Sequence, residues 1–154
     1  MMTPVRTLSV AGAGLAMMLV AGCRSHVQDE GTYAFTATEV LRDDCQLLGT
    51  SAALWDGTFS LHGDTVQMVY GLEDAHLAGN YREDGEQFEL DGTVGQVTRQ
   101  VENQQCLLDQ IDVHLDALTD SPNRFHGTLD VFYEASRPET CVCKLWVTFN
   151  AVKK

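Results

Sequence analysis

The sequence has little positive charge and lacks the motifs that mark common catalytic centres. Of its 154 residues, 10 are lysine or arginine and 22 are aspartate or glutamate, which gives a formal net charge of −12. A strongly negative field repels phosphate backbones, so the composition argues against nucleic-acid binding. The hydrophobic share of 44% is nevertheless ordinary for a globular protein, and no low-complexity tract is present, which argues against a disordered acidic chain.

Catalytic motifs are also missing. The chain has no Gly-x-Ser-x-Gly nucleophile elbow and no glycine-rich phosphate loop, and its glycines are spaced as turns. The acidic segments 82–86 and 89–92 do not follow the EF-hand order of calcium ligands, and Asp-Gly is a favoured hairpin turn. We therefore expect neither an enzyme nor a bound cofactor.

Residues 1–22 have the organisation of a removable export signal. Arg6 provides a basic start, and residues 8–20 form an apolar run too short to span a membrane stably. Arg6 is the only charged residue in this segment, so the net charge from residue 23 onward is −13.

The end of this segment, Val20-Ala21-Gly22-Cys23, resembles the lipobox of bacterial lipoprotein precursors, although Val20 stands where leucine is commoner. The resemblance covers residues 1–23 and implies that Cys23 becomes the first mature residue and carries lipid. Arg24, in place of the aspartate that often retains such proteins at the inner membrane, implies an outer-membrane location. The resemblance thus predicts a signal peptide at 1–22, a lipidated tether at 23–31 and a single domain at 32–154, held to the membrane through lipid on Cys23.

The remaining four cysteines form an even set, which in an exported domain predicts two disulfides. Cys141 and Cys143 are two residues apart in a strand-like run, so their side chains point the same way from Cα atoms about 6.5 Å apart. Cys45 and Cys106 are therefore each expected to bond to one member of that pair, in either combination. The alternative, a metal site with a Cys-x-Cys arm, fits less well because thiolate sites usually have Cys-x2-Cys spacing.

Short apolar-polar alternations, separated by glycine and aspartate, run along most of the chain. Such spacing leaves little room for helices, and only residues 39–48 are ambiguous. The pattern predicts an all-β, antiparallel meander of about eight strands, forming a small barrel or a sandwich, with the barrel preferred. The strands are expected near residues 33–37, 55–61, 65–70, 77–82, 88–90, 94–101, 111–117, 125–133 and 141–151.

The hairpin formed by 111–117 and 125–133 allows a register to be predicted. Placing Leu115 opposite Phe125 matches apolar faces, whereas a slip by one pair would set Asp112 against Asp130, a like-charge clash. The favoured register also places His114 opposite His126.

Two sets of residues stand out as candidate sites. His114 and His126, ringed by aspartates, are weak candidates for a divalent metal site, although a solvated polar face is the simpler reading. Phe132 and Trp146 are out of phase with the apolar faces of their strands and could form an exposed patch for a protein partner.

Together these features predict a non-catalytic outer-membrane lipoprotein acting by protein contact in the cell envelope, as an accessory component of a surface, secretion or motility assembly. The alternative is a β-barrel that binds a small apolar ligand. An open lumen would favour the ligand, whereas a filled core with Phe132 and Trp146 exposed would favour protein contact.

Overall fold

The computed structural model describes residues 28–154 apart from 83–84, 102 and 137–138. The signal, the lipobox and Cys23 lie outside the described residues. In the described part, no helix has the length and apolar character needed to cross a membrane. The strands are β1 (Gly31–Asp43), β2 (Gly57–His62), β3 (Thr65–Tyr70), β4 (Ala75–Tyr81), β5 (Gln87–Val101), β6 (Gln104–Ser121), β7 (Arg124–Glu134) and β8 (Cys143–Lys153), with one 3-10 turn, η1 (Glu139–Cys141).

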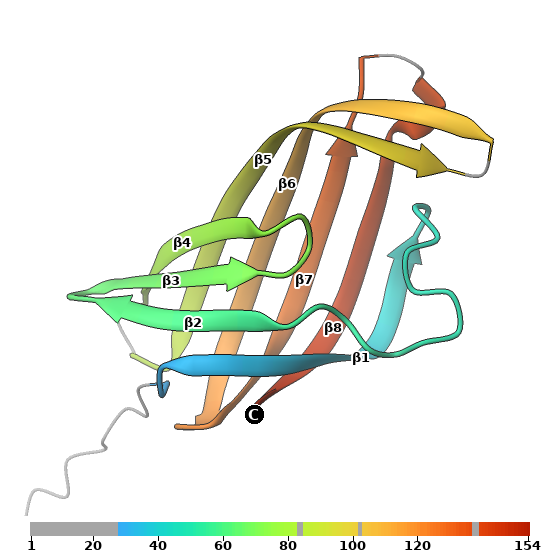
Figure 1. Ribbon diagram of the computed structural model, residues 1–154. Coiled ribbons are helices and arrows are strands. Elements are labelled where there is room, and N and C mark those ends of the chain that lie inside the picture. The colour runs from blue at the N-terminus through green and yellow to red at the C-terminus, as the bar shows by residue number, and fades with distance from the viewer. Residues whose placement is uncertain (1–27, 83–84, 102, 137–138) are drawn as a thin grey trace, which may run out of the picture.

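The eight strands form one closed antiparallel barrel in which each strand pairs with the next in sequence and β1 pairs with β8 (Figure 1). Buried and outward side chains alternate along β8 and along β6 from Ile111 to Thr119, which produces this architecture because one face of each strand fills the lumen. The predicted all-β antiparallel meander is confirmed, and the barrel is the form adopted.

The ambiguous segment 39–48 contains no helix. Its first part continues β1, where Val40 pairs with Val147 and Asp43 pairs with Leu145. Two register irregularities interrupt this pairing, between Ala37 and Glu39 and again two residues later. An extra residue in one strand of a pair bends that strand. The backbone hydrogen bonds between this segment and β8 would be lost if the segment formed a helix. Closure of the barrel therefore decides the conformation of this segment.

The predicted register of the β6–β7 hairpin is wrong. Leu115 pairs with Leu129 rather than Phe125, because β6 continues to Ser121 and pairs there with Arg124 across a two-residue turn. The predicted turn was longer and ended β6 too early. The observed register still avoids the like-charge clash, since it places Asp130 opposite His114. Gly127 allows close strand approach here: a Cβ would lie 1.9 Å from the backbone oxygen of Asp116.

Aromatic side chains fill the centre of the lumen. The Phe125 ring packs edge-on or tilted against five other rings, with centroid separations from 5.0 to 6.4 Å. Such contacts add to the large apolar area that each ring buries. The rings around Phe125 belong to Tyr33, Phe35, Phe59, Phe88 and Phe149.

The first described residues, which lead into β1, and the C-terminus lie at one end of the barrel, here called the terminal end (Figure 1). Gln28 is buried there and its amide donates to the backbone oxygens of Ser121 and Pro122, at 3.1 and 2.8 Å. It also donates to the hydroxyl of Tyr33 at 3.1 Å. Residues 28–31, which the sequence assigns to the tether, therefore belong to the packed structure and close this end.

Two disulfides brace the opposite end, here called the mouth. They join Cys45 to Cys143 and Cys106 to Cys141, with Cα atoms 5.2 and 5.8 Å apart. This confirms the predicted pattern and selects one of its two combinations. The loops that lead out of β1 and into β8 are thereby fixed to the wall of the mouth.

Candidate functional site

The structure does not bring His114 and His126 together. His114 pairs with Asp130 across the β6–β7 ladder, whereas His126 pairs with Leu118. The prediction that they face each other is wrong because it depended on the incorrect register. Each ring instead has its own carboxylate: the Nδ1 atom of His126 lies 2.8 Å from Asp120.

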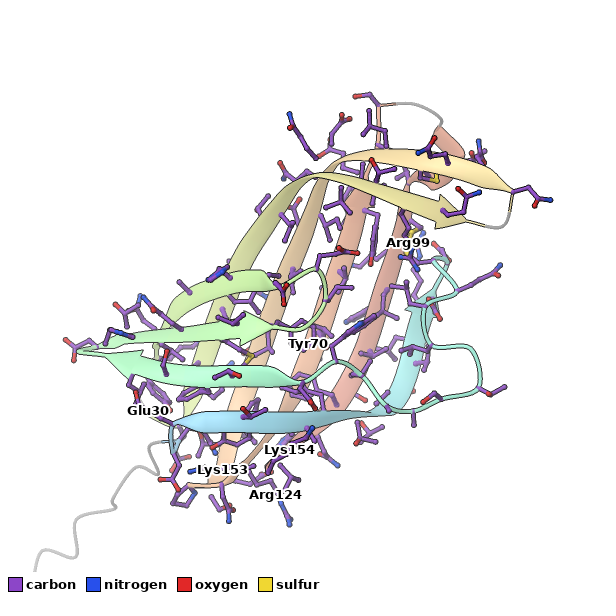
Figure 2. All side chains as sticks on the ribbon, in the orientation of Figure 1. Glu30, Tyr70, Arg99, Arg124, Lys153 and Lys154 are labelled. Carbon is purple, nitrogen blue, oxygen red and sulfur yellow. A yellow bond between two sulfur atoms is a disulfide. The ribbon has the colours of Figure 1, made fainter. Side chains whose placement is uncertain are left out.

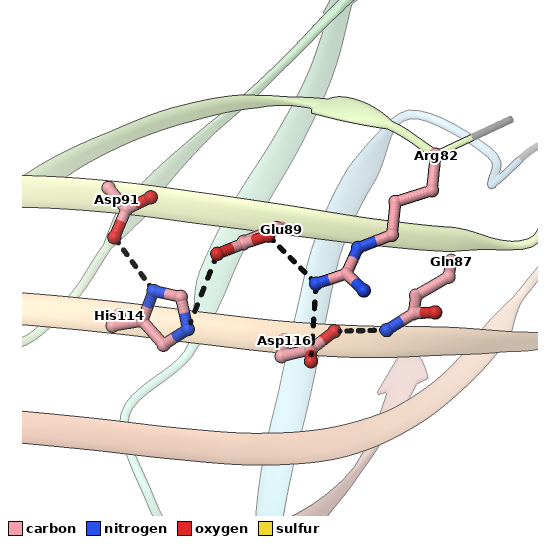
Figure 3. Close-up of polar contacts among 6 residues, drawn as sticks. All are labelled: Arg82, Gln87, Glu89, Asp91, His114 and Asp116. Atoms are coloured by element: carbon pink, nitrogen blue, oxygen red, sulfur yellow. Dashed lines mark hydrogen bonds and ion pairs between the residues drawn. The ribbon is translucent and has the colours of Figure 1, made fainter.

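His114 belongs to a different cluster on the outer wall, formed by β5 and β6 (Figure 3). Its Nδ1 atom lies 2.7 Å from Asp91, and its Nε2 atom lies 3.8 Å from Glu89. One ligand atom from each of these three residues lies within 4.8 Å of the others, which is the one such group of three in the described part of the chain. Histidine with two carboxylates suits a first-row divalent metal.

The same cluster is already compensated by protein groups. Arg82 donates to Glu89 at 2.9 Å and lies 3.8 Å from Asp116, which also accepts a hydrogen bond from Gln87 at 2.8 Å. A metal ion at Glu89 would face the Arg82 guanidinium, and the like charges would repel. These contacts are those of a solvated ion-pair network on a sheet surface.

Phe132 and Trp146 lie diagonally across β7 and β8 on the outer wall, each with 40% of its surface exposed. Lys144 lies opposite Phe132, places its ammonium 5.4 Å from the centroid of the Trp146 ring, and forms an ion pair with Asp130. We call these four residues the Phe132–Trp146 patch. The patch presents the partly exposed rings of Phe132 and Trp146 beside the ion pair of Lys144 and Asp130.

A pocket of about 450 Å³ opens at the mouth of the barrel. We call it the mouth pocket; its lining includes Arg99, Gln104, Leu108, Tyr133 and both disulfides. These residues come from β5, β6, β7 and the loops that the disulfides hold. Sequence analysis missed this site because its residues are scattered along the chain. The one available signal was Arg99, a lone basic residue on the polar strand expected at 94–101.

Arg99 and Tyr133 form the polar floor of the mouth pocket. The guanidinium carbon lies 5.3 Å from the centroid of the Tyr133 ring, a cation–π arrangement. Tyr133 is only 1% exposed, and its hydroxyl has no hydrogen-bond partner among the described residues. Burial raises the pKa of Tyr133, although the nearby guanidinium lowers it in part. This hydroxyl is therefore a neutral donor at physiological pH.

A second buried hydroxyl, that of Tyr70 on β3, also has no partner within the described structure. Burial raises the pKa of Tyr70 strongly, and a backbone contact at Trp55 lowers it in part. Figure 2 shows Tyr70 inside the barrel below Arg99, whereas Arg124, Lys153 and Lys154 lie at the terminal end.

A neighbouring pocket of about 430 Å³ shares Arg99 with the mouth pocket. Trp55, Leu72, Glu73 and Asp74 also line it. Glu73 and Asp74 are the central residues of the β3–β4 turn, and both have positive φ, at 53° and 52°. The mouth therefore combines one guanidinium, two carboxylates and aromatic surface.

No protein-family model matches the chain, and neither a curated protein nor a solved structure matches it. The geometry of the mouth is therefore the basis for assigning a function.

Proposed function

We propose that this protein is an outer-membrane-anchored lipoprotein whose β-barrel binds a small ligand in the mouth pocket and catalyses no reaction. The observation that carries the proposal is the pocket of about 450 Å³ at the mouth, where the half-buried Arg99 has no ion-pair partner in the described structure. A guanidinium in a concave site offers its hydrogen-bond donors to a ligand. Eight-stranded barrels have room for one small ligand at most, and in this barrel aromatic rings fill the centre of the lumen, so a ligand would lie at the mouth.

The anchor and the pocket are compatible in this arrangement. Cys23 precedes Gln28 by five residues, which span at most about 18 Å when extended. Gln28 closes the terminal end, so lipid on Cys23 would hold that end near the bilayer. The mouth lies at the other end and would face away from the membrane. The two disulfides support this location, because such bonds persist in oxidising compartments outside the cytoplasm.

A binding role suits the chemistry of the pocket better than catalysis. The four described cysteines are all in disulfides, and none of the four described histidines lines the mouth pocket or its neighbour. The pocket offers hydrogen-bond donors and apolar surface without a general base beside a nucleophile. The lining of the mouth pocket is also more polar than a small apolar ligand, the alternative predicted from the sequence, would require.

Blocking the pocket tests this function. The lipoprotein, purified in detergent, is heated with and without the low-molecular-weight fraction of a cell-envelope extract. A ligand at 100 times its Kd adds about 2.7 kcal/mol to the free energy of unfolding, which raises the melting temperature by several degrees. Gln104→Trp fills the pocket from an exposed lining position and should abolish that rise.

Gln105→Trp is the matched control, because residue 105 is equally exposed but does not line the pocket. It should retain the full rise in melting temperature. An equal rise for both variants, or none for the unmodified protein, contradicts ligand binding at the mouth.

The Phe132–Trp146 patch supports a second candidate, protein contact in the envelope. The filled lumen and the exposure of both rings are the combination that favours protein contact, because they leave a ligand only the mouth. A photo-crosslinking residue at position 146 should capture one specific envelope protein in intact cells. Position 152 is the control, since Val152 shares the outer face of β8 and is similarly exposed, but lies near the terminal end. Capture of the same proteins from both positions contradicts a role for the patch.

A further inference from the structure

The mouth carries charges of both signs that have no ionic partner in the described structure. Arg99, Glu73 and Asp74 line the same pocket, and no ion pair involves any of them within that part of the chain. The other carboxylates nearby are engaged: Asp44 pairs with Arg42, and Asp43 accepts from two backbone amides at 3.0 and 3.1 Å. The three remaining charges are available to a ligand.

The positive side of the mouth is built to receive a carboxylate. Arg99 is half-buried and offers a planar fork of donors that matches a carboxylate in two hydrogen bonds. The Tyr133 ring packs against this guanidinium, with 5.3 Å between the ring centroid and the guanidinium carbon, and helps to fix its position.

The negative side lies on the β3–β4 turn. Glu73 and Asp74 both adopt the left-handed conformation, with φ of 53° and 52°. Aspartate is among the residues that tolerate this conformation, whereas glutamate at position 73 destabilises the turn by about 1 kcal/mol. The turn places both carboxylates on the pocket that Arg99 also lines.

From these features we infer that the pocket lined by Arg99, Glu73 and Asp74 binds a small zwitterion, a short peptide with free ends, whose carboxylate contacts Arg99 and whose ammonium contacts Glu73 and Asp74. This inference rests on the proposed function and names its ligand class. An anion alone would be repelled by the two carboxylates and by the net charge of −13, and a cation alone would meet Arg99. The side chain of the peptide would lie against Trp55, which is partly exposed in the same pocket.

Three dipeptides of identical shape test the inference by isothermal titration of the lipoprotein in detergent. The probes are Ala-Phe, N-acetyl-Ala-Phe, which lacks the ammonium, and Ala-Phe amide, which lacks the carboxylate. Ala-Phe is expected to bind, and each blocked peptide at least tenfold more weakly. Equal affinity for the three, or no heat from Ala-Phe, overturns the inference.

Two variants assign each charge to its site. Arg99→Gln should remove the preference for Ala-Phe over its amide and keep the preference over the acetylated peptide. Glu73→Gln with Asp74→Asn should produce the reverse pattern. If these residues only support the fold, each variant should bind all three peptides more weakly by the same factor. Arg124→Gln, at the terminal end, is the control and should leave every ratio unchanged.

The inference and the proposed function fail in different ways. If extract stabilises the protein and Gln104→Trp abolishes the effect, yet Ala-Phe releases no heat, the zwitterion is wrong and the pocket remains. If Ala-Phe binds with the expected ratios and Gln104→Trp does not weaken it, the peptide lies in the neighbouring pocket that Arg99, Glu73 and Asp74 line, so the inference holds and the proposed use of the mouth pocket is wrong.

Discussion

At the scale of single residues, the tyrosine hydroxyls of the lumen differ sharply in their surroundings. Tyr33 donates to the backbone oxygen of Asp29 at 2.7 Å and accepts from Gln28, whereas the Tyr133 hydroxyl contacts Arg99 but has no hydrogen bond of good geometry to any described residue. Sequence patterns placed both rings on apolar faces, but no pattern distinguishes a paired hydroxyl from an unpaired one. That difference depends on which distant backbone atoms reach the ring.

Removing the Tyr133 hydroxyl should therefore not weaken the fold. We expect Tyr133→Phe to leave the free energy of unfolding unchanged or to raise it by up to about 1 kcal/mol, because no hydrogen bond is lost. Tyr33→Phe should lower it by about 1 kcal/mol or more. Urea unfolding of the two variants gives the comparison, and a similar loss in both would show that Tyr133 is hydrogen-bonded after all.

Burial of the tyrosines also predicts how stability depends on pH. Burial raises the pKa of Tyr33, Tyr70, Tyr81 and Tyr133 above the ordinary value of 10. Above pH 10 the unfolded chain loses these protons first, so the native state binds more protons and stability falls with rising pH. Stability should be insensitive to these groups below pH 10.

Urea midpoints measured from pH 8 to pH 11.5 check this dependence. Tyr70→Phe should reduce the slope above pH 10 by up to one proton, about 1.4 kcal/mol per pH unit, since Tyr70 is the most deeply buried of the four. A slope unchanged by this substitution would mean that Tyr70 ionises equally in both states.

At the scale of structural elements, the length of a hairpin turn determines the register of its two strands, which the pattern of apolar and polar residues does not. Alternation predicted the inner and outer faces of β6 and β7 correctly, but not their register. The register follows from the two-residue turn after Ser121, and it alone separates His114 from His126 and joins His114 to Asp91 on β5. A slip of the register by an even number of residues leaves the same side chains on the inner and outer faces. The composition of the faces therefore does not distinguish the observed register from the predicted one.

The β3–β4 turn offers a direct test of stability against function. Replacing Glu73 by asparagine and Asp74 by glycine gives the favoured Asn-Gly turn and should raise the free energy of unfolding by about 1–2 kcal/mol. The same change removes both carboxylates from the mouth. Urea unfolding and peptide titration should thus change in opposite directions. A less stable variant would show that these side chains support the turn.

At the scale of the whole molecule, strand order sets the two ends of the barrel apart. In an eight-stranded meander, both chain ends and the β2–β3, β4–β5 and β6–β7 turns lie at one end. The remaining four connections form the mouth, where both disulfides and Arg99 lie. The end that an anchor at Cys23 would hold is therefore opposite the end that would bind.

The anchor can be tested by fractionation. Cys23→Ala removes the thiol that would carry lipid, and each buried CH₂ of an acyl chain contributes about 0.8 kcal/mol to membrane binding. We expect the variant to leave the membrane fraction and the unmodified protein to remain there. Cys45→Ala with Cys143→Ala, which removes a disulfide and leaves Cys23, is the control. Unchanged fractionation of the Cys23 variant would contradict lipidation.

The sequence by itself determined the fold class and the pattern of disulfides. Period-two alternation makes each strand two-faced, and the spacing of Cys141 and Cys143 argues against a bond between them, so both predictions depend on local geometry. The structure places Cys141 in η1 rather than in the strand that this argument assumed. Tertiary structure alone decided the closure of the barrel, the register of β6 on β7 and the mouth. Arg99, Tyr133 and Glu73 lie on three different hairpins, and only the folded barrel brings them together, because convergence of distant residues leaves no local signal in a sequence.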